Sequence, residues 1–178
     1  MHADVISFWF DELDPKKWFT KDPSLDARIV ERFSSTHEKA SRCELHAWRE
    51  TAKGRLAEVL LLDQFSRNMF RDSPRAFAQD PLALALAQEA VRAGADDDLT
   101  PTERTFLYMP FMHSESLVIH DVAVELFTKN GIAQNLDYER KHKAVLDRFG
   151  RYPHRNAILG RPSTPEEVAF LKEPGSSF

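Results

Sequence analysis

The chain is organised around the stretch from Leu56 to Arg71, LAEVLLLDQFSRNMFR, in which nine of the fifteen residues from 56 to 70 are apolar. On a helical projection these residues do not form a single stripe. Leu56, Val59 and Leu60 point one way, whereas Phe65 and others point roughly the opposite way. A helix that is apolar nearly all round is an interior helix. We therefore predict a buried helix from about residue 52 to residue 70.

Charged positions interrupt this apolar pattern. Asp63 and Arg67 fall in the middle of one apolar face, and Arg71 follows one turn later. Spacings of four align all three on a helix. Ionised groups are rarely buried unless they are paired. The helix therefore carries charge into the core, either as a structural ladder of ion pairs or as the floor of a functional site.

The rest of the pattern also predicts helices. Their expected ranges are 4–10, 23–40, 82–93, 101–127, 136–149 and 163–172. Asp22-Pro23 and Asp80-Pro81 read as N-caps followed by proline at the first helical position, and Thr100 to Glu103 reads as a capping box. Pro110 is expected to kink or split the long helical stretch that contains it. No segment alternates as a half-buried strand does, so the chain is predicted to be all-α, with antiparallel helix pairs stacked in layers.

Length and composition narrow the class of protein. With 178 residues, the chain is expected to form one domain, residues 1–178. Its net charge of −4 argues against a general nucleic-acid partner. The single cysteine, Cys43, cannot form an internal disulfide, which favours the cytoplasm. No apolar run approaches about 18 residues, so no membrane span is expected.

A second group of polar residues follows Pro110, in the sequence MPFMHSE from Met109 to Glu115. His113 and His120 share a helical face. A metal site requires several such ligands to converge, and no HExxH motif is present, so no metal is predicted. His113 is better interpreted as a hydrogen-bonded histidine of the core or of a pocket.

A third group is the loop RFGRYPHRNAILGR, from Arg148 to Arg161, which holds four arginines and a histidine. Guanidinium groups match carboxylates and phosphates with two parallel hydrogen bonds. These arginines either pair with core acids or form an anion pocket. Counting Asp63 and Glu115 as the nearby acids, we expect a surplus of positive charge that faces solvent or binds an anion.

The stretches LLLDQFSRNMFR, FLYMPFMHSE and RFGRYPHRNAILGR followed by STPEEVAFL closely resemble the bacterial family known as domain of unknown function 924. The opening VISFWF and the closing FLKEPGSSF are also similar to the ends of that family, so the resemblance covers essentially the whole chain. It implies a tetratricopeptide-like right-handed array of about seven to nine helices and carries over no activity. The matching positions are Asp63, Gln64, Arg67, Asn68, His113, Glu115, Arg151, His154, Arg155 and Asn156.

Three interpretations of function stay open. The first is a pocket that binds a small anionic ligand through Asp63, Gln64, Arg67, Asn68, Arg151, Arg155 and Asn156. The second is a tetratricopeptide-like module that binds a peptide. The third is a small-molecule hydrolase with His113 or His154 as base and Glu115 or Asp63 as the orienting carboxylate. No cofactor is predicted, and neither nucleic acid nor a membrane is an expected partner.

Overall fold

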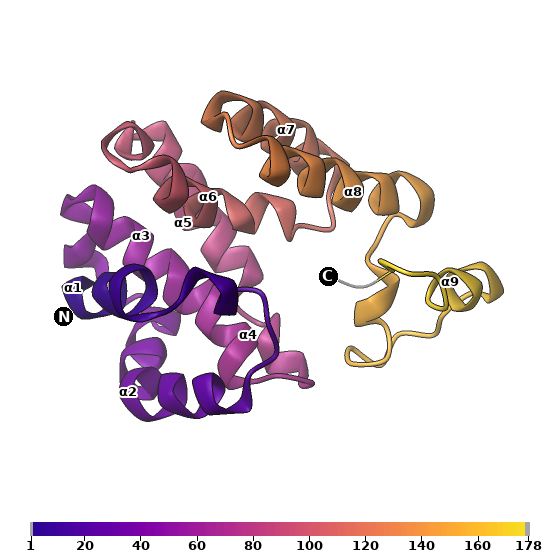
Figure 1. Cartoon of the computed structure of the whole chain (residues 1–178), viewed down its shortest axis with the longest axis horizontal. Helices are drawn as coiled ribbons and strands as arrows, with labels where there is room; N and C mark the ends of the chain where they lie inside the picture. Colours follow the sequence, from indigo (N-terminus) through magenta and orange to yellow (C-terminus); the bar gives the residue numbers. More distant parts are fainter. Residues whose placement is uncertain (1, 177–178) are drawn as a thin grey trace.

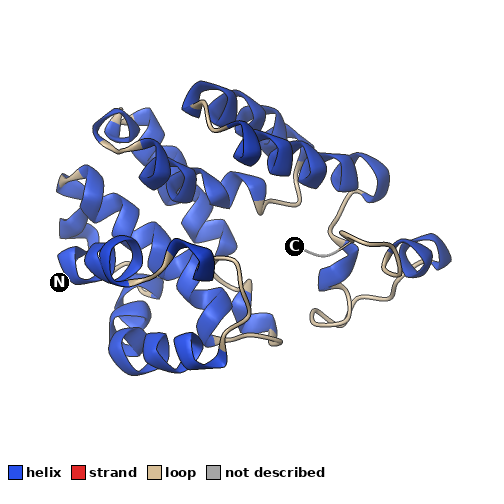
Figure 2. Ribbon diagram, in the orientation of Figure 1, coloured by secondary structure: helices blue, strands red, loops and turns tan. Residues whose placement is uncertain are grey.

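The computed structural model describes residues 2–176, and every regular element within that range is helical (Figures 1 and 2). The α-helices are α1 (His2–Ser7), α2 (Pro23–Ser41), α3 (Ala52–Leu60), α4 (Ser66–Met69), α5 (Asp80–Arg92), α6 (Pro101–Met112), α7 (Leu117–Asn130), α8 (Ala133–Phe149) and α9 (Pro165–Phe170). A π-helical turn, Leu61–Phe65, joins α3 to α4 without a break, so the described range contains eight helices. The predicted all-α class is confirmed.

The interior helix predicted at the centre of the sequence is confirmed. Its apolar residues from Leu56 to Phe65 are fully buried on all sides, and Asp63 is buried with them. Thr51 caps its start by accepting a hydrogen bond from the backbone N–H of Gly54. A side chain at Gly54 would lie 1.9 Å from the carbonyl oxygen of Trp48, so only glycine lets these two backbones approach.

The other helices pack around this central helix. The α3 segment lies against α1, α5 and α6, while α2 covers the π-helical turn and α4. Next come α6, α7 and α8, each packed on its predecessor, with α7 and α8 side by side in Figure 1. Residues 150–161 then lead to α9, which lies at the far end of the molecule from α1 (Figure 1).

The predicted split of the long helical stretch that contains Pro110 is confirmed. The break begins at His113, three residues after the proline. Pro110 lies in the last turn of α6, which ends at Met112, and α7 begins at Leu117. Proline removes one backbone donor and weakens the helix at this point. His113 is therefore the C-cap residue of α6, and its side chain contacts Asp63 of the central helix.

The capping predictions are partly confirmed. Asp22 caps α2 through the backbone N–H groups of Ser24 and Leu25, and Thr100 forms the expected capping box with Glu103. A second capping box, at Thr164, had not been predicted. The N-cap prediction for Asp80 is wrong. Asp80 is the first residue of α5, and no side chain caps that helix. The carboxylate of Asp80 instead binds arginines from two other parts of the chain.

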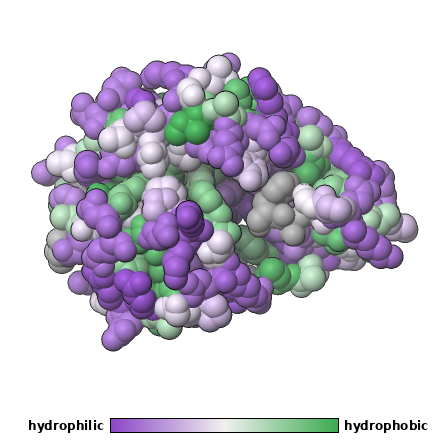
Figure 3. All heavy atoms as spheres, viewed as in Figure 1, coloured by the Kyte–Doolittle hydropathy of each residue, from purple (hydrophilic) through white to green (hydrophobic). Residues whose placement is uncertain are grey.

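The surface drawn in Figure 3 is mostly hydrophilic, with apolar side chains in small separate groups. Within residues 2–176, no helix is long and apolar enough to cross a membrane. The right-handed tetratricopeptide-like arrangement stays a prediction. The expected domain 1–178 and the closing sequence FLKEPGSSF include residues 1 and 177–178, which lie outside the described range.

Candidate functional site

His113 and Asp63 form the shortest link between the central helix and the end of α6. The imidazole Nδ1 lies 2.7 Å from Oδ1 of Asp63, and the Asp63 side chain is completely buried while that of His113 keeps 15% of its surface exposed. An ionised carboxylate only accepts hydrogen bonds, so Nδ1 carries the proton and donates it. The second ring nitrogen, Nε2, makes no hydrogen bond to any described residue. The pair is thus a histidine held by a buried acid.

Asp63 sits in the π-helical turn, and its other contacts keep it ionised. Gln64 donates from Nε2 to Oδ2 at 2.6 Å, and Nη1 of Arg67 lies 3.0 Å from Oδ1. Burial acts to raise the pKa of Asp63, but the Arg67 charge and the hydrogen bonds from His113 and Gln64 outweigh it and hold that pKa below its usual value. Short π-helical insertions occur often at functional sites.

His113 is kept neutral by its surroundings. Burial lowers the pKa of its imidazole, and the nearby Arg67 charge lowers it further, against the opposing effect of Asp63. A neutral imidazole that donates from Nδ1 has its lone pair on Nε2. The geometry therefore leaves His113 with a hydrogen-bond acceptor at neutral pH.

Asp80 joins this arrangement from the start of α5. Its two oxygens accept from Nη1 and Nη2 of Arg67, both at 3.0 Å, and Oδ2 also accepts from Nη1 of Arg155 at 3.2 Å. Arg155 in turn donates from Nη2 to the backbone oxygen of His113 at 3.0 Å. We call the six residues Asp63, Gln64, Arg67, Asp80, His113 and Arg155 the central cluster. Sequence reasoning missed Asp80, because Asp-Pro at a helix start looks like an ordinary N-cap.

The expected surplus of positive charge is wrong, because each arginine of the motifs has a carboxylate partner. Within the central cluster, Asp80 and Asp63 balance Arg67 and Arg155. Elsewhere the pairs are Arg71 with Asp26, Arg148 with Glu166, Arg151 with Glu167, and Arg161 with Glu115. Four of these partners, Asp26, Asp80, Glu166 and Glu167, lie outside the motifs from which the surplus was counted.

The remaining predicted site residues serve other contacts. Asn68 donates to Asp26 of α2 at 2.8 Å. Arg151 and Asn156 both bond Glu167 and so attach the loop to α9. The predicted residue Glu115 accepts from the backbone N–H of Tyr152 at 2.7 Å. Arg151, Asn156 and Glu115 thus hold the loop in place, whereas Asn68 attaches the end of the central helix to α2. None of the four belongs to the central cluster.

A second buried network lies behind the loop, around Tyr152. The tyrosine hydroxyl donates to the backbone oxygen of Met112 at 2.6 Å and lies 3.0 Å from Nε2 of His120. His120 Nδ1 lies 2.6 Å from Oε1 of Glu139, whose pKa is raised by burial. All three side chains are fully buried, so we assign this network to holding α6, α7, α8 and the loop together.

Acidification should destabilise the protein through the histidines beside Tyr152. Burial lowers the pKa of His142 to about 3, and burial together with the Arg155 charge lowers that of His154 to about 4. Both values lie below the unfolded value of about 6.5. The unfolded chain therefore binds more protons in this window, and stability present above about pH 6.5 is lost as the pH falls towards 4. Each histidine contributes a slope of up to about 1.4 kcal/mol per pH unit.

Urea unfolding between pH 7.5 and pH 4.5 measures this slope. The His142→Gln variant should show a shallower pH dependence than the natural chain, because one of the buried histidines whose pKa is lowered on folding is gone. Equal slopes in the two proteins would contradict the assignment.

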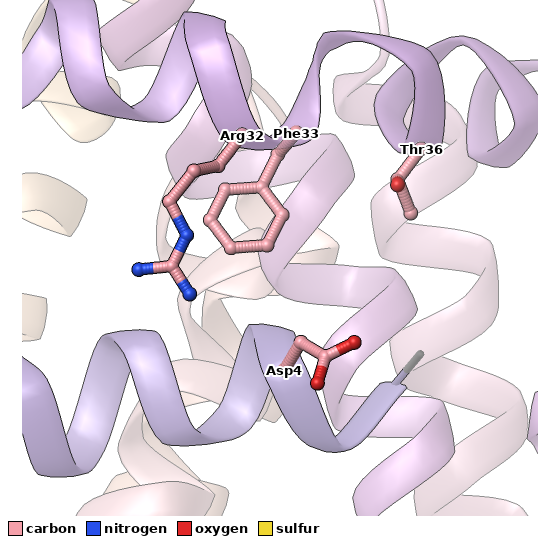
Figure 4. Close-up of a pocket in the computed structure, with 4 residues that line it drawn as sticks. All are labelled: Asp4, Arg32, Phe33 and Thr36. Carbon is pink, nitrogen blue, oxygen red and sulfur yellow. The ribbon is translucent and has the colours of Figure 1, made fainter.

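Two hollows of the structure are lined by residues outside the central cluster. One, of about 230 Å³, is lined by Asp4 of α1 and by Arg32, Phe33 and Thr36 of α2, as Figure 4 shows. Its arginine is already paired with Glu12 at 2.6 Å. The other, of about 410 Å³, runs between α2 and α4. Over residues 2–176, no three histidine, cysteine or acidic side chains are grouped as metal ligands.

Comparisons with known proteins agree with one another. The model of a family described as a bacterial protein of unknown function, DUF924, matches residues 5–175. The solved structure of the protein of unknown function ATU0120 from Agrobacterium tumefaciens is similar to this chain, with 42% identity and a TM-score of 0.92. The similarity covers 96% of each chain. The search of curated proteins gave no match.

Proposed function

This chain belongs to the bacterial protein family of unknown function DUF924, and we propose that its Asp63–His113 pair is an acid–base site for a small anionic ligand. The observation that supports this most directly is the 2.7 Å contact between a completely buried carboxylate and a histidine that is partly exposed. A histidine oriented in this way by a carboxylate is the arrangement that hydrolases use to activate water or a hydroxyl group.

The proposed chemistry follows from the protonation states. Neutral His113 accepts a proton at Nε2 from a bound water or from a hydroxyl group of the ligand. Asp63 then stabilises the imidazolium that forms, since its carboxylate already accepts the Nδ1 hydrogen bond. We assign the base to His113 rather than His154, because the buried carboxylate of Asp63 orients His113, whereas the ring of His154 lies against that of Tyr152.

An anionic ligand is favoured by the arginines next to His113. The Arg67 side chain keeps 21% of its surface exposed and lies close to the same oxygen of Asp63 as His113 does. Asp80 neutralises part of this charge, so the anionic group of a ligand would compete with Asp80 for Arg67 and Arg155. Weak binding that falls as salt is raised is therefore expected.

Nuclear magnetic resonance of the imidazole nitrogens tests this proposal. In the free protein we expect His113 to show the tautomer protonated at Nδ1 and a pKa below that of an ordinary histidine. Addition of phosphate or malonate should shift the Nε2 signal of His113. Hydrolysis of p-nitrophenyl acetate and p-nitrophenyl phosphate should fall by about 10²–10⁴-fold in His113→Gln.

The matched control is His142→Gln, which removes a different buried histidine and leaves the central cluster intact. It should bind anions and hydrolyse the two esters as the natural chain does. If His113 shows the opposite tautomer, and neither anion moves its signals, the pair is a structural ion pair and the proposal fails.

The tetratricopeptide-like interaction module stays a prediction. Its sequence argument was that helical pairs commonly offer a concave surface to peptides. The polar residues of this chain instead gather in one compact cluster contributed by the central helix, α5, α6 and the loop. That distribution supports a small-molecule site ahead of an extended peptide groove.

A further inference from the structure

A groove of about 410 Å³ lies between α2 and the segment that follows the central helix. This volume falls in the range of small-molecule sites, about 300–1,000 Å³. Its apolar lining comes from Val30 of α2 and from Met69 and Phe70 at the end of α4. Polar lining comes from Ser34, His37, Glu38, Ser41, Arg75 and Gln79. The groove is therefore apolar along part of its wall and rich in hydrogen-bonding groups along the rest.

Arg75 differs from the arginines of the central cluster. Its guanidinium lies over the ring of Phe70, 3.9 Å from the centroid, and within the described chain it makes neither an ion pair nor a side-chain hydrogen bond. Its five N–H donors are thus available to a ligand. Stacking on an aromatic ring fixes the plane of a guanidinium and leaves its edge open for a bidentate contact.

His37 adds a second polar group at the same groove. Only 7% of the surface of His37 is exposed, and its Nε2 lies 2.8 Å from Oγ of Ser66. No described residue hydrogen-bonds its Nδ1, and His37 is one of the residues that line the groove. Glu38 is the acid of the groove, but its carboxylate is paired with Arg42.

We propose that this groove binds a small carboxylate with an aromatic or branched aliphatic body, with the carboxylate on Arg75 and the body against Val30, Met69 and Phe70. The charge complementarity comes from a guanidinium that forms no ion pair with any acid of residues 2–176, and the apolar contact comes from side chains that already line the hollow. This site is separate from the Asp63–His113 pair, because the residues of the central cluster do not line it.

The experiment is a titration of the full chain with phenylacetate, followed by two-dimensional amide NMR. Signals of Val30, His37 and Met69 should shift and saturate with a dissociation constant near the millimolar range. Acetate and benzyl alcohol, which each carry half of the ligand, should bind more weakly. Phenyl phosphate carries a phosphate in place of the carboxylate and so tests which of these two anions the groove prefers. We expect it to bind more weakly than phenylacetate.

Arg75→Gln should weaken phenylacetate binding about tenfold, the loss of one charge-assisted contact. Arg140→Gln is the matched control, because it removes the same charge from an exposed position on α8. Glu38→Gln should tighten binding by no more than about threefold. The proposal is overturned if phenylacetate shifts none of the groove signals up to about 10 mM, or if Arg75→Gln binds as tightly as Arg140→Gln.

Discussion

Replacing Asp63 by alanine is expected to lower the free energy of unfolding by about 3–5 kcal/mol, the cost of breaking a buried ion pair by removing one partner. The Asp63 side chain is completely buried, accepts hydrogen bonds from His113 and Gln64, and forms an ion pair with Arg67. Alanine leaves the His113 and Gln64 donors without that acceptor and removes one of the two carboxylates that pair with Arg67, and water cannot easily replace it. Urea unfolding at pH 7.5 measures the difference.

The matched control for Asp63→Ala is Glu89→Ala, which also removes one acid from an ion pair within a turn of helix. Glu89 and Arg92 are both more than half exposed, so this pair should contribute less than about 1 kcal/mol. Asp63→Asn adds a second comparison, because it keeps the shape of the side chain and removes only its charge. If Asp63→Ala costs no more than Glu89→Ala, the prediction is contradicted and the ion pairs of the central cluster do not stabilise the fold.

The sequence predicted those parts of the fold that depend on local pattern. The central helix is apolar on every side, and this pattern can be satisfied only in the interior. Thr100 was recognisable as a cap because a capping box is complete within four residues. The π-helical turn at Leu61–Phe65 was not predictable in the same way, since one inserted residue leaves no composition signal.

The sequence predicted which residues belong to the candidate site, but not which of them form ion pairs or hydrogen bonds with one another. The motifs named Asp63, Arg67, His113 and Arg155, and the structure brings all four together. The role of Asp80 could not be predicted, because the sequence Asp80-Pro81 is also what an ordinary helix N-cap looks like. A carboxylate that bridges Arg67 and Arg155 is 13 residues from one and 75 from the other, so its role exists only in the folded chain.

The same limit explains the error in the charge count. Only the acids of the motifs, Asp63 and Glu115, were counted against the arginines, but Arg71 finds Asp26 at a separation of 45 residues and Arg155 finds Asp80 at 75. In a chain with 28 acidic and 24 basic residues, distant acids are numerous enough to neutralise a local basic loop. Arg75 escapes this neutralisation, and it lies outside the three motifs.

Replacing Leu60 by alanine is expected to lower the free energy of unfolding by about 2–5 kcal/mol. Leu60 is fully buried in α3, which packs against α1, α5 and α6, so the cavity left by the missing atoms has walls on several sides. Such a cavity cannot close without moving whole helices, and the packing contacts of its lining are lost. Urea unfolding monitored by circular dichroism measures the loss.

Leu117→Ala provides the control, because it deletes the same atoms from a side chain that is 40% exposed at the start of α7. Water already fills the space beside Leu117, so that substitution should cost less than about half as much as Leu60→Ala. The comparison separates burial from helix propensity, since alanine favours both helices equally. A cost for Leu60→Ala below about 1 kcal/mol would mean that the central helix tolerates a cavity, and the assignment of this helix as the centre of the core would be wrong.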